Sequence, residues 1–177
     1  MKNKFGRIAA ITFAALLAAG CAIAQEHKWA ARSLDNVEWA VHEKLAVLPF
    51  YGVFDTVRFE VQGDTVTLSG SVVKESVKHN AERAVKQVSG VQKVVNNIEL
   101  LPSSRRDDAL RTNLYRAIYA EQSPNGAVPS VHIIVKNGWA LLEGVVDSEA
   151  ERSTIMGRAL NVTAHVSDNL RVAQAAL

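Results

Sequence analysis

The stretch Val66-Thr67-Leu68-Ser69-Gly70-Ser71-Val72 decides the fold of this 177-residue chain. Apolar and polar side chains alternate along it, which is the pattern of a β-strand with one face in a core and the other toward water. A second alternating stretch, Val57-Arg58-Phe59-Glu60-Val61, comes before it, and Gly63-Asp64 lies between the two. Glycine and aspartate tolerate the positive φ angles of a tight turn, so the two stretches predict a β-hairpin.

The hairpin pattern returns 74 residues later, so the chain contains an internal repeat. Residues 131–135 and 140–146 alternate in the same way, and Asn137-Gly138 supplies the turn between them. Each copy closes with one more predicted strand, at residues 94–100 and 166–172. These last strands are only 72 residues apart, so the second copy must have a tighter connection before its final strand.

Apolar residues at spacings of three and four predict two helices in each copy. Before the hairpins, the predicted inward residues are Val37, Val41, Leu45 and Leu48 in the first copy and Leu110, Leu114, Ala117 and Ile118 in the second. After the hairpins they are Val77, Ala81, Ala84, Val85 and Val88 in the first copy and Ala150, Ile155, Ala159 and Val162 in the second. In the second copy, Asp107 or Asp108 is predicted to cap the first helix and Ser148 the second.

The element order αββαβ, found twice, predicts an α+β fold of two tandem modules. In each module we expect a three-stranded mixed sheet with two helices on one face, because that arrangement buries the apolar side of every element. The helical crossover implies that the second and third strands run parallel. We expect domains at residues 34–101 and 107–173, joined by a polar linker at 102–106. So short a linker predicts that the two domains pair with each other.

Three glycines are interpreted as structural. Gly70 and Gly144 lie inside predicted strands, where a glycine relieves crowding under a crossing helix or permits a bulge. A close approach to a ligand is the less favoured interpretation. Gly90 follows the first copy's second helix and is predicted to terminate it as a glycine C-cap.

The first residues resemble an export signal. Lys2, Lys4 and Arg7 precede an apolar run at residues 8–19, which is the length of a signal-peptide core and too short to span a bilayer. Two cleavage patterns overlap. Ala22-Ile23-Ala24 fits ordinary cleavage, which would remove residues 1–24 and release the protein into the periplasm. The overlapping Leu17-Ala18-Ala19-Gly20-Cys21 resembles a lipobox, which would make Cys21 the acylated first residue of an outer-membrane lipoprotein. We expect cleavage after Ala24.

Charge and cysteine content exclude several classes of protein. The precursor carries 20 basic and 18 acidic side chains, but residues 1–24 hold three of the basic ones, which leaves a net charge of −1. A nucleic-acid partner is therefore not expected. The only cysteine is Cys21, so the folded part has no disulfide and no thiolate. The five histidines show no metal spacing, and no cofactor or nucleophile motif is present, so we expect neither an enzyme nor a cofactor.

The first copy resembles the BON domain, a family named for bacterial osmotically inducible and nodulation proteins. The resemblance rests on the strand at residues 66–72, on Ala81 and Ala84, and on the stretch Gly90-Val91-Gln92-Lys93-Val94-Val95-Asn96-Asn97. The second copy keeps Gly144, Val146 and Asp168-Asn169 but lacks the Gly-Val turn. This resemblance implies a non-catalytic envelope module, associated with phospholipid binding, envelope integrity, osmotic stress or chaperone-like protection.

Four residues are candidates for contact with a phospholipid surface. Arg105, Arg106 and Arg111 belong to the densest basic cluster outside the signal, and Trp139 follows a predicted hairpin turn. The favoured alternative for the arginines is that they solvate the helix and pair with Asp107, Asp108 and Glu121. Amphipathic aromatic rings favour the membrane interface, whereas a tryptophan packed over the sheet edge is the alternative interpretation. The runner-up function is a periplasmic holdase, which would need exposed apolar loops such as residues 49–54. An envelope protein is the other partner that we consider.

Overall fold

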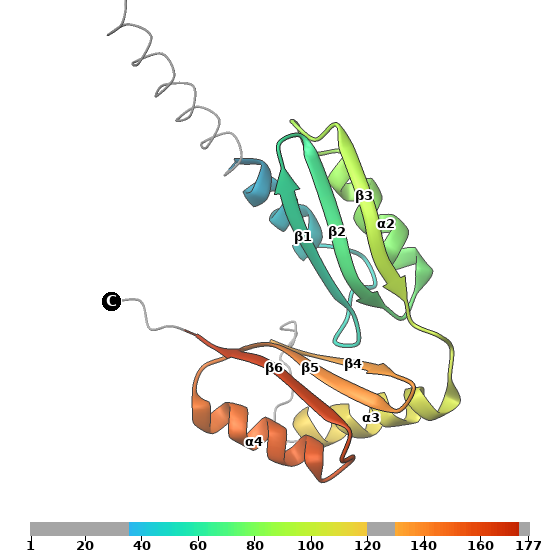
Figure 1. The fold of residues 1–177 in the computed structure, drawn as a ribbon, viewed down its shortest axis with the longest axis vertical. Helices are drawn as coiled ribbons and strands as arrows, with labels where there is room; N and C mark the ends of the chain where they lie inside the picture. The colour runs from blue at the N-terminus through green and yellow to red at the C-terminus, as the bar shows by residue number, and fades with distance from the viewer. Residues whose placement is uncertain (1–35, 120–129, 174–177) are drawn as a thin grey trace, which may run out of the picture.

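The computed structural model describes residues 36–119 and 130–173, which form two αββαβ modules (Figure 1). The first module contains a helix at residues 36–46, then β1 (Thr56–Gln62), β2 (Thr65–Val72), α2 (Glu75–Lys86) and β3 (Lys93–Leu100). The second contains α3 (Arg105–Tyr119), β4 (Val131–Lys136), β5 (Trp139–Val146), α4 (Glu149–Leu160) and β6 (Val166–Val172). The predicted export signal with Cys21 lies outside the described residues.

Both sheets have the predicted mixed topology. Their strand orders are β1-β2-β3 and β4-β5-β6, with an antiparallel hairpin followed by a parallel third strand. Val66 pairs with Val94 in the first sheet and Ala140 with Val166 in the second, which reproduces the offsets of 74 and 72 residues. The predicted α+β fold of two repeated modules is therefore confirmed.

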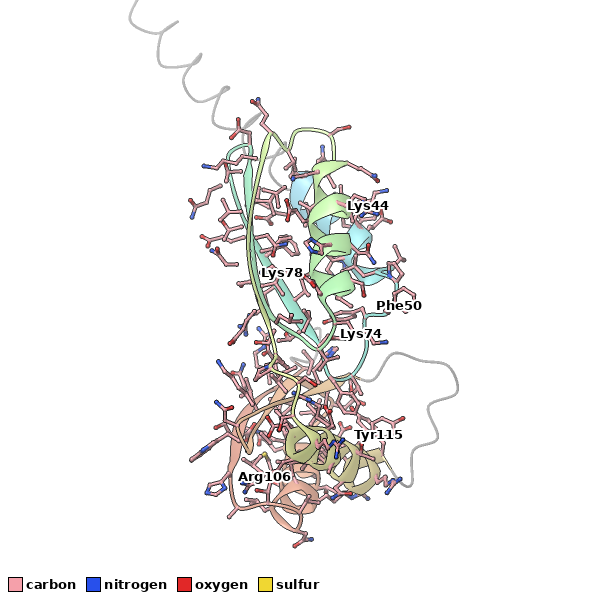
Figure 2. All side chains as sticks on the ribbon, turned by 90° about the vertical axis from the view of Figure 1, so that its right-hand side faces the viewer. Lys44, Phe50, Lys74, Lys78, Arg106 and Tyr115 are labelled. Carbon is pink, nitrogen blue, oxygen red and sulfur yellow. The ribbon has the colours of Figure 1, made fainter. Side chains whose placement is uncertain are left out.

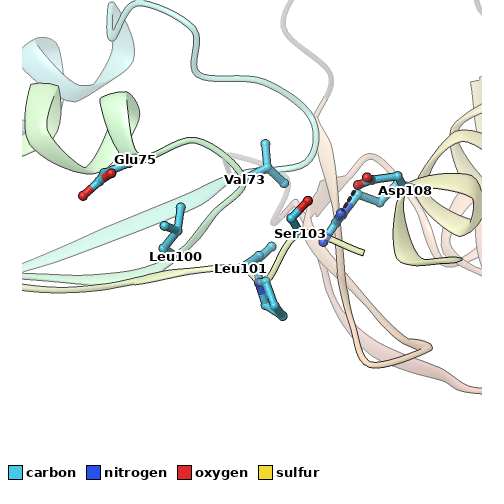
Figure 3. Close-up of a pocket in the computed structure, with 8 residues that line it drawn as sticks. Val73, Glu75, Leu100, Leu101, Ser103 and Asp108 are labelled. Carbon is cyan, nitrogen blue, oxygen red and sulfur yellow. Dashed lines mark hydrogen bonds and ion pairs between the residues drawn. The ribbon is translucent and has the colours of Figure 1, made fainter. Parts of the chain in front are cut away.

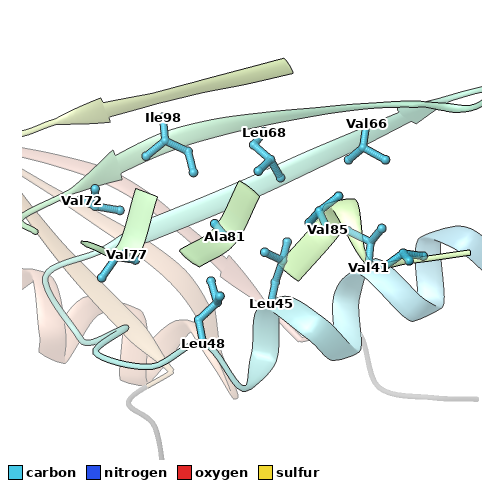
Figure 4. Close-up of a cluster of buried hydrophobic side chains, with 11 residues drawn as sticks. Val41, Leu45, Leu48, Val66, Leu68, Val72, Val77, Ala81, Val85 and Ile98 are labelled. Atoms are coloured by element: carbon cyan, nitrogen blue, oxygen red, sulfur yellow. The ribbon is translucent and has the colours of Figure 1, made fainter. Parts of the chain in front are cut away.

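Each core lies between one face of the sheet and two helices. In the first module the buried side chains come from the N-terminal helix, from α2 and from the inner face of the sheet (Figure 4); they include Val41, Leu45, Leu48, Leu68, Val77, Ala81, Val85 and Ile98. The second core repeats this arrangement with Leu114, Ile118, Ile133, Leu142, Ile155 and Ala159. Ala150 was predicted to point inward but is exposed. Ala150 and Ile155 are five residues apart, so their side chains point to clearly different sides of α4, and Ala150 does not reach the core.

Gly70 and Gly144 occupy equivalent positions with unusual backbone geometry. Their φ angles are +121° and +155°, which disfavour any residue with a Cβ. A Cβ at Gly70 would overlap the carbonyl group of Thr56, and one at Gly144 would overlap that of Ser130. The crowding partner is therefore the backbone at the start of the neighbouring strand. The predicted contact with a crossing helix is wrong.

Two predicted helix ends are also corrected. The C-cap of α2 is Gln87, and Gly90, with φ +94°, lies three residues further along the turn. Helix α3 begins at Arg105, inside the predicted linker, and its capping side chain is Ser104, whose Oγ accepts a hydrogen bond from the Asp107 N–H at 3.2 Å. Ser148 caps α4 as predicted, accepting from the Glu151 N–H.

Side chains satisfy some main-chain groups on the edge strands β3 and β6. In β3, Ile98 donates its N–H to Asn96 Oδ1 at 3.2 Å, and its carbonyl accepts from Lys78 Nζ at 2.6 Å. In β6, the Leu170 N–H donates to Asp168 Oδ1 at 2.9 Å. Main-chain groups satisfied in this way cannot pair with an added strand, so strand addition at these points is disfavoured.

Candidate functional site

The loop at residues 49–55 links the two modules. Its Val53 carbonyl accepts a hydrogen bond from the Ile133 N–H on edge strand β4 at 2.7 Å. Val53 and Phe54 pack against the core of the second module, and the Phe54 ring meets Tyr115 edge-on at 6.1 Å. Part of this apolar loop therefore covers the core of the other module.

Polar contacts extend this junction over the outer face of the second sheet. Arg58 Nη1 lies 2.9 Å from Glu143 Oε1, and Lys136 Nζ lies 2.5 Å from Glu99 Oε1. The Tyr51 ring stacks at a tilt on His132, with 5.4 Å between ring centroids. Burial is the main cause that raises the pKa of Tyr51. The two modules therefore contact each other through both apolar and charged groups, in line with the pairing expected from the short linker.

The β4–β5 hairpin is tied to the start of α3. Asp107 is buried, and its two carboxylate oxygens accept hydrogen bonds from the N–H groups of Asn137 (2.9 Å) and Gly138 (2.8 Å). The guanidinium of Arg106 lies beside Gly138. Trp139 follows on β5, 59% exposed, with its ring 4.6 Å from that of His165. Asp107 thus brings the basic start of α3 and an exposed indole to one end of the second module.

We call Arg105, Arg106 and Trp139 the hairpin-tip patch. All three side chains are exposed, and within the described ranges neither arginine forms an ion pair. Figure 2 shows Arg106 on the second module, well separated from Lys44 and Lys78 on the first. Three of the four predicted lipid-contact residues are therefore exposed, and the Arg106 guanidinium lies beside Gly138, which directly precedes Trp139.

Arg111, the fourth candidate, is buried inside the second module. It is only 4% exposed, because it points from α3 toward β4. Its Nη2 donates to the Val135 carbonyl at 2.5 Å and its Nη1 to Asp108 Oδ1 at 2.5 Å. A side chain held in this way cannot reach a lipid surface, so Arg111 is removed from the predicted contacts.

A second exposed feature combines Phe50 of the predicted apolar loop with Trp39 and Val47, which sequence reasoning missed. Trp39, Val47 and Phe50 are 64%, 76% and 68% exposed, and we call them the outer apolar row. Trp39 lies roughly opposite the buried face of the N-terminal helix that carries Val41. Lys74 Nζ sits 5.4 Å from the centre of the Phe50 ring, and Figure 2 shows the two residues together. The sequence signal for this row was the presence of apolar residues that do not follow the helical spacing of the buried ones.

Neither a metal-binding group nor a membrane-spanning helix is found in the described residues. Within residues 36–119 and 130–173, no three side chains of the metal-binding types are grouped to hold an ion. Over the same two ranges, no helix combines the length and apolarity that crossing a bilayer requires. The candidate sites that we consider are exposed surfaces and one pocket at the module junction.

The two αββαβ modules define a tandem α+β repeat. The chain matches the family model described as "BON domain" twice, at residues 33–102 and 106–174. It therefore belongs to the BON-domain family, whose members are typically periplasmic or envelope-associated and whose domain is a non-catalytic binding domain.

Similarity to solved structures is distant. One is the C-terminal domain of CdsD, a structural protein of the type III secretion system of Chlamydia trachomatis, at 14% identity and a TM-score of 0.30, covering 78% of this chain and 63% of that one. A second CdsD structure gives 14% identity and a TM-score of 0.29, with coverage of 76% and 92%. The chain thus spans less than two thirds of the first structure. No curated protein matches the chain.

Proposed function

We propose that this protein is a non-catalytic envelope protein whose hairpin-tip patch docks on anionic phospholipid. The observation that carries the proposal is the Asp107 bridge, which ties the hairpin that carries the exposed Trp139 to the helix start that carries Arg105 and Arg106. Neither arginine forms an ion pair within the described residues. Guanidinium groups bind phosphate with fixed geometry, and an indole ring favours the headgroup region. Through such contact the protein would support envelope integrity under stress.

The expected binding is local and sensitive to salt. The chain without residues 1–24 is nearly neutral, so net charge cannot attract it to a membrane. Each basic residue near an anionic surface contributes about 1 kcal/mol, and salt screens this contribution. Two arginines would therefore contribute about 2 kcal/mol to membrane binding. The part of the Trp139 ring that enters the headgroup region would add to this.

Co-sedimentation with anionic vesicles at low and high salt tests the proposal. We expect Arg105→Glu combined with Arg106→Glu to abolish most binding at low salt, and Trp139→Ala to weaken it. Arg83→Glu combined with Arg116→Glu is the matched control, because both side chains are exposed outside the patch. Binding that ignores salt, or that survives the first double reversal, would contradict the proposal.

The alternative function is a holdase for unfolded envelope proteins, and the outer apolar row favours it. Exposed aromatic and aliphatic groups are what such an activity requires. An aggregation-suppression assay separates the two functions. The test variant is Trp39→Ser combined with Phe50→Ser. If this variant no longer suppresses aggregation but still binds vesicles, the outer apolar row serves a holdase and not phospholipid binding.

For the location of the protein, we propose export followed by cleavage after Ala24, with release into the periplasm. The basic start, the apolar run and the Ala22-Ile23-Ala24 pattern support this proposal. Acylation at Cys21 is the competing route and would anchor the protein to the outer membrane. The mass of the mature protein decides between them, because lipid attached to Cys21 would overturn the first route.

A further inference from the structure

A pocket of about 280 Å³ lies at the junction of the two modules (Figure 3). Val73, Leu100 and Leu101 form an apolar wall from the first module. Asp108 and Arg111 of α3 line the other end. Leu100 is 45% exposed, so the wall offers apolar surface to a ligand. This volume suits a few side chains and is too small for a folded domain.

Arg111 contributes a buried donor that has no partner within the described residues. The residue is 4% exposed, and its Nη1 and Nη2 atoms are bonded to Asp108 and to the Val135 carbonyl. Its Nε makes no hydrogen bond with any group in the described part of the chain. An arginine Nε can only donate, and because this atom is buried, a ligand carbonyl can reach it only if neighbouring groups move.

Carboxylates mark the two ends of the pocket. Glu75 lies at one end and Asp108 at the other, with the leucine wall between them (Figure 3). Their side chains are 69% and 62% exposed. Asp108 also balances the charge of Arg111, so the lining carries a net negative charge. Glu75 Oε1 lies 3.4 Å from His79 Nε2, which is outside the lining, so a bound ammonium would share Glu75 with that imidazole. An anionic lipid headgroup is disfavoured here, whereas a ligand with a positive group is favoured.

We propose that this pocket binds a short, extended, apolar peptide segment that carries an ammonium group. A carbonyl oxygen of the peptide would accept from Arg111 Nε, aliphatic side chains would lie on Leu100 and Leu101, and the ammonium would pair with Glu75. The ammonium could be a free amino terminus or a lysine side chain, which present the same chemistry. This site differs from the hairpin-tip patch in the sign of the charge that it selects.

Titration of the mature full chain with tripeptide amides, followed by NMR, tests the site. The probes are Leu-Leu-Leu-amide, with a free amino terminus, and acetyl-Leu-Leu-Lys-amide, with only a lysine ammonium. Both should shift the amide signals of Leu100 and Leu101 saturably, and the tighter of the two identifies the source of the ammonium. Acetyl-Leu-Leu-Glu-amide should bind about fivefold or more weakly, because its charge is reversed.

Substitutions at exposed wall and rim residues keep the test independent of folding. Leu100→Ser should raise Kd about fivefold through lost apolar contact, and Glu75→Gln about two- to fivefold. Leu160→Ser and Glu149→Gln are matched controls, because Leu160 is 52% exposed and Glu149 is the equivalent of Glu75 in the second module. Kd should change less than about twofold in these controls.

Three results would overturn the proposal. One is the absence of saturable shifts at Leu100 and Leu101 with either positively charged probe. Another is equal binding of the glutamate probe. The third is an unchanged Kd in both Leu100→Ser and Glu75→Gln. Vesicle binding by the hairpin-tip patch is measured separately, so failure of one proposal does not decide the other.

Discussion

Replacing Phe54 with alanine should weaken the second module, although Phe54 precedes the first strand of the first. The Phe54 ring packs against the second core and meets Tyr115 edge-on. Truncating a fully buried phenylalanine costs about 3–5 kcal/mol, and an aromatic pair adds about 0.5–1.5 kcal/mol. Because Phe54 is only partly buried, we expect a loss of about 2–4 kcal/mol.

Hydrogen exchange of backbone amides, resolved by residue with NMR, locates this loss. In Phe54→Ala the amides of β4 and β5 should exchange faster, while those of β1 and β2 keep most of their protection, because opening follows the weakened core. The matched control is Phe59→Ala, since Phe59 packs against the first core and should give the opposite pattern. The cross-module role of Phe54 is refuted if both variants lose protection in β1 and β2 alone.

Three further predictions concern stability. Gly70→Ala should lower the free energy of unfolding in urea by about 3 kcal/mol or more, because the new Cβ meets the Thr56 backbone. Gly157→Ala on the open face of α4 is the control and should raise it by up to about 1 kcal/mol. Equal effects of the two substitutions would refute this reasoning. Burial raises the pKa of Tyr119 to about 12 from 10.0. The stabilisation that the protonated Tyr119 hydroxyl gives to the folded state is therefore complete below pH 10 and is lost as pH rises toward 12. Tyr119→Phe should remove this alkaline loss, and an unchanged pH profile would contradict the assignment. Asp107→Ala should cost about 2–3 kcal/mol by freeing two N–H groups, and should broaden the Trp139 indole signal; a sharp, unshifted signal would show that the bridge does not position the ring.

The elements themselves could be predicted because their signals are local. Alternation over residues 66–72 and turn residues at Asn137-Gly138 constrain only near neighbours, and the structure has both features where they were expected. The helix caps were harder to predict from the sequence. Asp107 and Ser104 are both good capping residues, and only the three-dimensional arrangement assigns the cap to Ser104 and leaves Asp107 to hold the hairpin.

The candidate sites depended more on tertiary structure. Arg105, Arg106 and Trp139 could be selected from charge and residue type, and the structure places all three on the surface. Arg111 has the same residue type and the same sequence neighbourhood, yet it is buried against Val135. A helix carries successive side chains around its axis, so a charge cluster in the sequence divides between solvent and interior according to what packs on each face.

By itself, the sequence determined the repeat, the αββαβ order and the apolar faces, because periodic patterns act within a few residues. Only the tertiary structure decided that Val53 and Phe54 cover the core of the other module, since the contact of Val53 with Ile133 spans 80 residues and the loop has no periodicity. It also decided that Gly70 faces the Thr56 carbonyl and that Arg111 lines a pocket between modules. Contacts between distant segments are chosen by packing and burial of the whole chain, which no local pattern encodes.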